Sequence, residues 1–329
     1  MTAPASPAPS DKAPTRLGAA EIVPIVLFAG LALLPAAFGG RAYLLGLVMR
    51  GMIFAIAALG LDFLVGYGAL VSFGHAASVG LGAYAVGILA AHGIAETLIA
   101  LPVALLAATG FAALTGLVCL RTRGVYFIMI TLAFGQMAYF TASSLAPYGG
   151  DDGLTVRMRD TLLGLPLFAD EHAFYYVVFA ALLGAYALAR AVVGSRFGRV
   201  FRGARENAAR LAAVGYDVYR FQLVGYAFAG TLGGLSGFLL ANATDFVSPA
   251  YMSWQRSGEL IIMVLLGGIG RLHGAVIGAI AFILIEEWLS GATEHWKLVF
   301  GPFLVLVVLF ARGGLIGLGA QLSRVVRRG

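Results

Sequence analysis

The chain has 329 residues, of which 60% are hydrophobic and only 12% are charged, and its mean hydropathy is +0.91. Soluble domains carry about 25% charged residues, so this composition excludes a water-soluble globular protein. The formal charge of +6 does not indicate nucleic-acid binding, because arginine on the cytosolic side of a membrane protein explains the excess. The single cysteine, Cys119, excludes an intramolecular disulfide framework and a cysteine-built metal site. The composition predicts an all-α, polytopic transmembrane protein.

A membrane-crossing helix needs about 20 predominantly apolar residues. Residues 1–20 are rich in Pro, Ala and Ser and predict a disordered cytosolic tail, and residues 320–329 predict a basic cytosolic tail. The transmembrane domain between them, residues 21–319, contains the apolar runs Ile22–Phe38, Tyr43–Gly66, Ala69–Ala91, Leu98–Leu120, Val125–Ala146, His172–Val193, Phe221–Ala243, Ser257–Ile269, Ala275–Leu289 and Leu298–Ala311. We predict eight to ten spans with broken or re-entrant segments. The number is ten if the short pair at 257–289 crosses twice and eight if it folds back as a hairpin.

The distribution of Lys and Arg sets the orientation. With the N-terminus inside and ten crossings, 16 of the 22 basic residues fall inside, five fall outside, and Arg50 lies within a span. A bias of this size predicts that both termini are cytosolic. The eight-crossing alternative gives the same orientation.

Two loops stand out in this topology. Residues 190–220 contain seven arginines and place a cytosolic loop, 194–220, between two spans. This loop is either a docking element for a soluble partner or arginine-rich only because orientation requires it. The longest outer loop, 147–171, is acidic and is either ordered against an external partner or simply solvated.

Polar residues interrupt the glycine-rich run that follows the second span. Broken helices are tolerated at bilayer depth only where protein or a watered cavity surrounds them, and small residues also allow close helix contacts. The run therefore lines a solute pathway or makes a tight helix contact, and we favour the pathway. The candidates for lining it are Asp62, Ser72, Gly74, His75, Ser78 and Gln136. Three further acids, Glu259, Glu286 and Glu287, lie near predicted span ends, from which they can reach the headgroups.

Catalytic motifs are absent from the sequence. It contains no GxxxxGK[ST] phosphate loop, no HExxH and no GxSxG elbow. An intramembrane enzyme therefore has no support, and we expect no catalytic residue, no metal and no cofactor in this chain. Any ATP hydrolysis would belong to a separate subunit.

Four segments resemble LivM-type permeases, the membrane subunits of branched-chain amino acid ABC transporters. They are ALGLDFLVGYGALVSFGHAASVGLGAYAVGIL, RGVYFIMITLAFGQM, SRFGRVFRGARENAARLAAVGYDVYRFQLVGYAFAGTLGGLSG and SGELIIMVLLGGIGRLHGAVIGA. They cover most of residues 58–278 in the order found in the family. The resemblance implies a bacterial inner-membrane importer in which the chain pairs with a second, similar permease subunit. It also implies two cytosolic ATPase subunits and a periplasmic substrate-binding protein as partners, with membrane lipid around the complex.

The resemblance further implies that the loop 194–220 is the coupling loop, whose short helix fits a groove on the ATPase. The residues that correspond to this element are Arg205, Glu206, Ala208, Leu211, Ala212 and Gly215. The family's alanines are matched only loosely around them. Helical spacing predicts that Ala208, Leu211 and Ala212 form one narrow face within Glu206–Val214. Gly215 is expected to end the helix, because glycine adopts positive φ at little cost.

The substrate favoured by the resemblance is a branched-chain amino acid such as leucine, isoleucine or valine. Similar permeases serve urea, short amides and aromatic acids, so these remain alternatives. A proton-coupled secondary transporter is the alternative of a different class. It would use the acids within the spans as proton relays, but these lack a clear matched pair and the cytosolic loop would have no purpose.

Overall fold

The computed structural model describes residues 19–38, 41–156, 159–161, 164 and 168–292, together with residues 295, 298, 300–302, 313–315 and 317. The elements are α1 (Ala19–Phe38), α2 (Ala42–Asp62), η1 (Phe63–Tyr67), α3 (His75–Ala91), α4 (Thr97–Cys119), α5 (Val125–Ser143), η2 (Ala146–Tyr148), η3 (Gly150–Asp152), β1 (Leu154–Thr155), α6 (Glu171–Gly194), α7 (Arg196–Ala213), α8 (Val218–Thr244), β2 (Phe246–Val247), η4 (Pro249–Met252), α9 (Trp254–Gly267) and α10 (Leu272–Ala292).

The all-α prediction is confirmed. Six helices are long and apolar enough to cross a membrane: Ala42–Tyr67, Thr97–Cys119, Val125–Ser143, Glu171–Gly194, Val218–Thr244 and Leu272–Ala292. The shorter apolar helices Ile22–Ala37 and His75–Ala91 accompany them. The predicted span Leu298–Ala311 and both predicted tails lie almost entirely outside the described residues.

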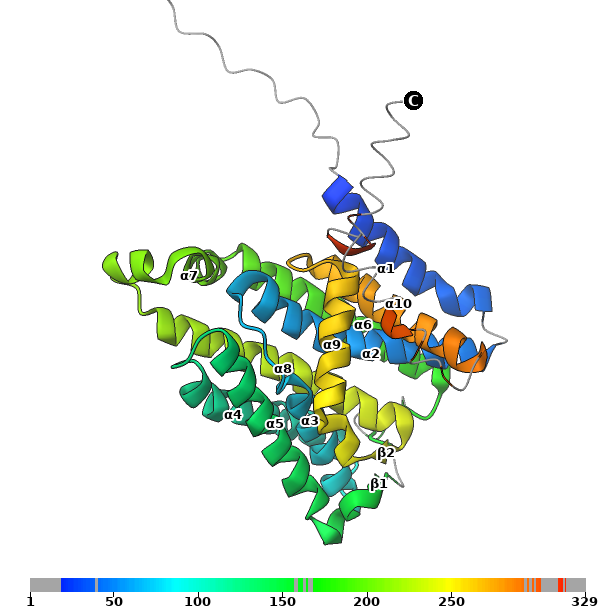
Figure 1. Ribbon diagram of the computed structural model, residues 1–329. Helices are drawn as coiled ribbons and strands as arrows, with labels where there is room; N and C mark the ends of the chain where they lie inside the picture. Colours follow the sequence, from blue (N-terminus) through cyan, green and yellow to red (C-terminus); the bar gives the residue numbers. More distant parts are fainter. Residues whose placement is uncertain are drawn as a thin grey trace, which may run out of the picture.

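The connections between helices collect at two ends of the bundle (Figure 1). At one end, β1 pairs antiparallel with β2, and Glu96, which precedes α4, forms a bridge with Thr161. At the other end, the α2–α3, α4–α5 and α6–α8 connections line one cleft. The chain alternates between these ends, as the orientation count requires. Because the second end carries α7 and the arginine-rich connections, the positive-inside rule assigns it to the cytosol.

The predicted break in the glycine-rich run is present. α2 ends in a single π-helical segment, η1, and residues 69–74 are not helical before α3 begins at His75. Protein surrounds this segment. The Cα of Gly74 lies against the Thr131 carbonyl of α5, and Gly68 lies against the Phe201 ring of α7. The backbone at bilayer depth is thus covered by neighbouring helices, as a non-helical segment requires.

Helix α8 is the central element, because its glycines allow other helices to approach its backbone. A side chain at Gly237 would collide with the Val79 carbonyl of α3, and one at Gly234 would lie 2.6 Å from Cβ of Ala108 in α4. Gly60 of α2 makes the same kind of approach, with its Cβ position 2.8 Å from the Ala229 carbonyl oxygen. Small residues at these positions permit the close packing that drives helix association in membranes.

The predicted pair of short segments consists of two unequal helices. α10 extends from Leu272 to Ala292 and is long enough to cross, whereas α9 has 14 residues. The chain from β2 through η4 and α9 leads from the outer end to the Gly268–Arg271 turn at the cytosolic end, and α10 returns outward. This arrangement supports two crossings rather than a re-entrant hairpin.

The glycine contacts of α8 predict a position-specific effect of adding one methyl group. Gly237→Ala should lower the stability of the detergent-solubilised protein by about 1–3 kcal/mol, because the new Cβ overpacks the α3 backbone. Gly110→Ala in α4 is the matched control, since nothing lies within 4 Å of its Cβ position. Thermal unfolding of the two variants measures the difference. Equal midpoints would contradict the packing described here.

Candidate functional site

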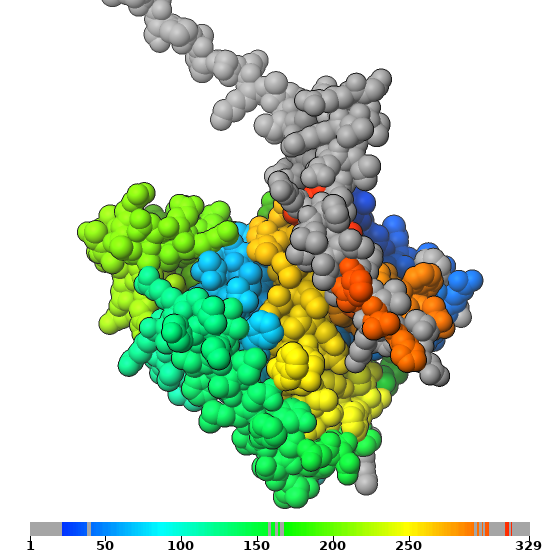
Figure 2. Space-filling model, viewed as in Figure 1, coloured from blue at the N-terminus to red at the C-terminus, as the bar shows by residue number. Residues whose placement is uncertain are grey.

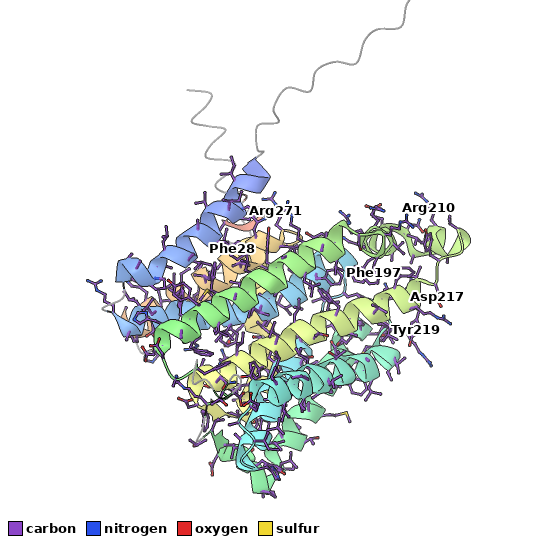
Figure 3. All side chains as sticks on the ribbon, turned by 180° about the vertical axis from the view of Figure 1, so that it is seen from behind. Phe28, Phe197, Arg210, Asp217, Tyr219 and Arg271 are labelled. Carbon is purple, nitrogen blue, oxygen red and sulfur yellow. The ribbon has the colours of Figure 1, made fainter. Side chains whose placement is uncertain are left out.

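Helix α7 projects beyond the bundle at the cytosolic end, between α6 and α8 (Figure 1). Ser195 caps its N-terminus, with its hydroxyl oxygen accepting a hydrogen bond from the Gly198 N–H at 3.2 Å. Seen from behind, Phe197, Arg210, Asp217 and Tyr219 gather at this end, with Arg210 on the projecting part (Figure 3). The predicted cytosolic loop is therefore mostly helix and carries its basic residues outside the bundle.

The helix is kinked, which corrects the expectation of one continuous segment from Glu206 to Val214. Asn207 has φ −158° and ψ 93°, outside the helical region. Its side-chain Oδ1 accepts a hydrogen bond from the Arg210 N–H at 2.9 Å and so caps a new helical turn. The element thus consists of an inner segment before Asn207 and a tip segment from Ala208 to Ala213. The sequence interpretation missed the role of Asn207, although Asn is a preferred N-cap residue.

The inner segment is anchored in the membrane-spanning helices by aromatic stacking. Phe201 is fully buried, and its ring stacks on Phe63 of η1 with centroids 4.8 Å apart and an interplanar angle of 8°. Gly68 and Gly225 leave room for this ring. On the same segment, Arg205 donates a hydrogen bond from Nη1 to the Gly66 carbonyl oxygen. Both contacts join α7 to the π-helical end of α2.

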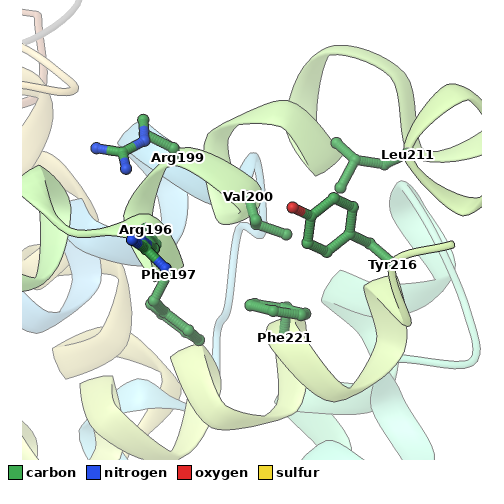
Figure 4. A pocket seen from close by; sticks show the side chains of 7 residues that line it. All are labelled: Arg196, Phe197, Arg199, Val200, Leu211, Tyr216 and Phe221. Carbon is green, nitrogen blue, oxygen red and sulfur yellow. The ribbon is translucent and has the colours of Figure 1, made fainter. Parts of the chain in front are cut away.

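Gly215 ends the tip segment as predicted. Its φ is +94°, its N–H donates to the Ala212 carbonyl oxygen at 3.0 Å, and the Tyr216 N–H donates to the Leu211 carbonyl oxygen at 3.2 Å. This pair of bonds is a Schellman motif, in which a hydrophobic contact across the glycine is usual. Leu211 and Tyr216 provide that contact on one wall of a cleft of about 600 Å³ (Figure 4).

The predicted small-residue face does not point in one direction. Leu211 is half-buried and turns back toward the inner segment, where its side chain would collide with any Cβ on Gly203. Ala208 is also half-buried, whereas Ala212 is exposed. The outward face of the tip segment therefore consists of Ala209, Arg210, Ala212, Ala213 and Val214, the last 71% exposed. Glu206 is exposed beside it.

Asp62 connects the end of α2 to the turn between α9 and α10. Its carboxylate is fully buried, and Oδ1 accepts a hydrogen bond from the Gly270 N–H at 2.7 Å. Its Oδ2 is buried and has no hydrogen-bond partner among the residues that the structure describes. Gly66 lies against Gly270 on the same side, so Asp62 lies one helical turn from the carbonyl that binds Arg205. The structure thus places Asp62 between α7 and the α9–α10 turn.

The other predicted pathway residues take part in helix contacts. His75 is buried, with Nε2 3.2 Å from the Ala57 carbonyl oxygen, and Ser78 lies against Gly230 and Gly233 of α8. Ser72 is buried, with its hydroxyl 3.3 Å from that of Tyr226. Gly74 packs on Thr131, and Gln136 is half-buried on α5. These residues cluster around the break before α3, and the pathway role predicted for them stays a prediction.

At the outer end, the acidic loop is ordered against its own chain. Arg159 forms a bidentate pair with Asp245, with both N–O distances 2.8 Å, and this pairing raises the pKa of the Arg159 guanidinium. Asn242 donates to Asp160 at 3.0 Å. Burial raises the pKa of the Asp160 carboxyl, and the bond from Asn242 opposes that shift. The loop is thus tied to the outer end of α8.

Comparison with known proteins identifies the family. The profile described as "Branched-chain amino acid transport system / permease component" matches residues 43–309. The chain belongs to this family. It is 26% identical over 289 residues to the high-affinity branched-chain amino acid transport system permease protein LivM of Escherichia coli K12, covering 80% of this chain and 68% of that protein.

Two further relatives, over shorter shares of the chain, are also named as permease proteins. LivH of Escherichia coli K12, from a high-affinity branched-chain amino acid transport system, is 28% identical over 150 residues, or 45% of this chain and 47% of LivH. The autoinducer 2 import system permease protein LsrC of an Enterobacter species is 28% identical over 64% of this chain and 60% of that protein. No solved structure matches the chain. The protein is therefore a multi-pass transport permease of the LivM type and not an enzyme.

The contact between Asp62 and Gly270 predicts the effect of two substitutions on the α9–α10 turn. Asp62→Asn keeps an oxygen acceptor for the Gly270 N–H, whereas Asp62→Leu removes it and leaves a buried donor unpaired, at a cost of about 1–3 kcal/mol. Hydrogen exchange at residues 268–271 should therefore accelerate in the leucine variant and not in the asparagine variant. Equal hydrogen-exchange rates in the two variants would contradict a role for the Asp62–Gly270 hydrogen bond in holding this turn.

Proposed function

We propose that this chain is the membrane-spanning subunit of an ATP-driven importer of branched-chain amino acids in the inner membrane of a bacterium. Its partners are a second permease subunit, two cytosolic ATPase subunits and a periplasmic binding protein. The chain itself binds no cofactor, and ATP is bound by the ATPase subunits. The similarity to LivM and LivH proteins supports this composition, because both are permease proteins of branched-chain amino acid transport systems.

One observation carries the proposed mechanism: α7 presents an exposed tip on a segment that is anchored to the transmembrane helices. The outward face of the tip has three alanines, whose small side chains let the helix backbone approach the walls of a groove on a partner. The Schellman motif and the Asn207 cap hold its conformation at both ends. A rigid helix of this kind transmits a displacement instead of absorbing it.

In this mechanism, closure of the ATPase subunits displaces the tip, and the displacement passes to the bundle through two contacts. The Phe201–Phe63 stack and the Arg205–Gly66 hydrogen bond both end on η1. From η1, the Asp62–Gly270 hydrogen bond leads to the α9–α10 turn. A π-helical segment is a site where a helix can change its register locally, so η1 is the proposed hinge.

Branched-chain amino acids are the proposed substrates because the family profile and the LivM relatives carry that name. Permeases for urea, amides or aromatic acids are the alternative within this class. A proton-coupled secondary transporter is the alternative outside it, but the exposed and capped tip of α7 would then have no partner.

Enlarging the outward face of the tip should uncouple transport. Ala212→Trp fills the space needed for docking, and Gly215→Val forces a branched residue to adopt φ +94° at the helix stop. Either change should reduce ATP-driven uptake by the complex roughly tenfold or more while membrane insertion stays intact. Ala146→Trp, on an exposed alanine at the outer end, is the matched control. Full uptake by the Ala212 and Gly215 variants would refute the docking role.

A further inference from the structure

Apart from residues near the ends of α1, α6 and α8, the charged residues within the transmembrane helices are concentrated at one place. Asp62 belongs to the contacts described above. The others lie where α2, α9 and α10 meet, with α2 and α10 in extensive contact and α9 packed on both. We call Arg50, Arg256, Glu259 and Glu286 the α9 charge cluster. Glu287, the next residue on α10, accepts a hydrogen bond from the Tyr43 hydroxyl at its edge.

The cluster extends deep into the bundle. The guanidinium of Arg256 lies over the ring of Phe54, with its Cζ 5.4 Å from the ring centroid. Phe54 is in the middle of the α2–η1 helix, which spans Ala42–Tyr67. The neighbouring Ser257 is equally deep, because its hydroxyl accepts a hydrogen bond from the Ala76 N–H at the start of α3. Although Arg256 is in the first turn of α9, it is therefore not at the membrane surface.

Charges of both signs lie together in the cluster. Arg256 donates from Nη1 to Glu259 Oε2 at 2.6 Å. Glu286 lies within electrostatic range of Glu259, Arg50 and Arg256. A guanidinium has five N–H groups in a fixed planar fork, so the bond to Glu259 leaves further donors on Arg256. The cluster can therefore hold a carboxylate at its arginines and an ammonium at its glutamates at the same time.

The cluster is partly open. The side chains of Arg256 and Glu259 are 21% and 25% exposed. In the space-filling view, α9 forms a strip on the visible face of the molecule, between α3 and α5 on one side and α10 on the other (Figure 2). A partly exposed charged group at bilayer depth is costly against lipid, so it faces a watered cavity or another protein chain.

We infer that the α9 charge cluster lines the solute pathway and binds the charged head of an α-amino acid. Arg256, with Arg50, binds the α-carboxylate, because a guanidinium matches a carboxylate in charge and geometry. Glu286 and Glu259 bind the α-ammonium. A zwitterion neutralises both halves of the cluster, whereas a neutral amide or urea neutralises neither. This inference rests on the proposed importer function and narrows its substrate class to solutes that carry both charges.

Access of water to the cluster can be tested independently of transport. The only cysteine, Cys119, is buried, so Cys119→Ala provides a background without a reactive thiol. A membrane-impermeant methanethiosulfonate reagent reacts with thiolates, which require water. In the assembled complex, Glu286→Cys should react roughly tenfold or more faster than Leu106→Cys, whose apolar position on α4 is 72% exposed. Equal and slow labelling of both would overturn the inference.

Transport measurements test the role of the positive charge. Arg256→Gln should reduce the maximal rate of leucine uptake by about tenfold to hundredfold, because a charge-assisted hydrogen bond to the solute is lost. Arg256→Lys should restore part of the rate. Arg41→Gln removes the same charge from an exposed residue that precedes α2 and should transport normally. Unchanged uptake by Arg256→Gln would overturn the inference.

The same variants separate this inference from the proposed function. If Arg256→Gln lost the second permease subunit on purification, the cluster would be a contact between subunits and the inference would fall. If the unmodified complex showed no ATP-dependent amino acid uptake, the proposed function would fall, whereas the labelling of Glu286→Cys would still report on water access.

Discussion

The close approach of Gly66 to Gly270 is the constraint on which the cytosolic half of the molecule depends. A Cβ atom on Gly66 would lie 2.5 Å from Gly270 Cα, so position 66 cannot carry a side chain without separating α2 from the α9–α10 turn, and Gly270 itself has φ +76°, which favours glycine. This approach brings the Gly270 N–H to Asp62 and leaves the Gly66 carbonyl oxygen for Arg205. Three segments far apart in the sequence therefore share one contact point, and α7 is part of it.

Much of this arrangement could be predicted from the sequence. Hydropathy located the long apolar helices, and the polar residues after Gly66 indicated the broken segment before α3. The orientation given by the arginine count stays a prediction. Gly215 was predicted to end α7, because only glycine adopts its backbone conformation readily. These features depend on local composition or on the number of charges, and both can be read from a single sequence.

Features that depend on tertiary contacts could not be predicted. Leu211 turns inward because Gly203 has no side chain and leaves space for it. At the kink, the Asn207 side chain accepts a hydrogen bond from the Arg210 N–H. The predicted run Ala275–Leu289 includes Glu286 and Glu287 but is three residues shorter at each end than α10, Leu272–Ala292. The hydrogen bond from the Tyr43 hydroxyl of α2 to Glu287 of α10 is visible only when these helices are packed together. Helical spacing alone also could not show whether the glycines serve packing or a pathway.

The central claim is that ATP hydrolysis by partner subunits drives uptake through this permease. The most direct measurement uses proteoliposomes that contain the complete complex, with ATP trapped inside and the amino acid-loaded binding protein outside. We expect leucine uptake that requires both ATP and the binding protein and that persists when a protonophore collapses the proton gradient. Uptake that continues without ATP and stops with the protonophore would contradict it.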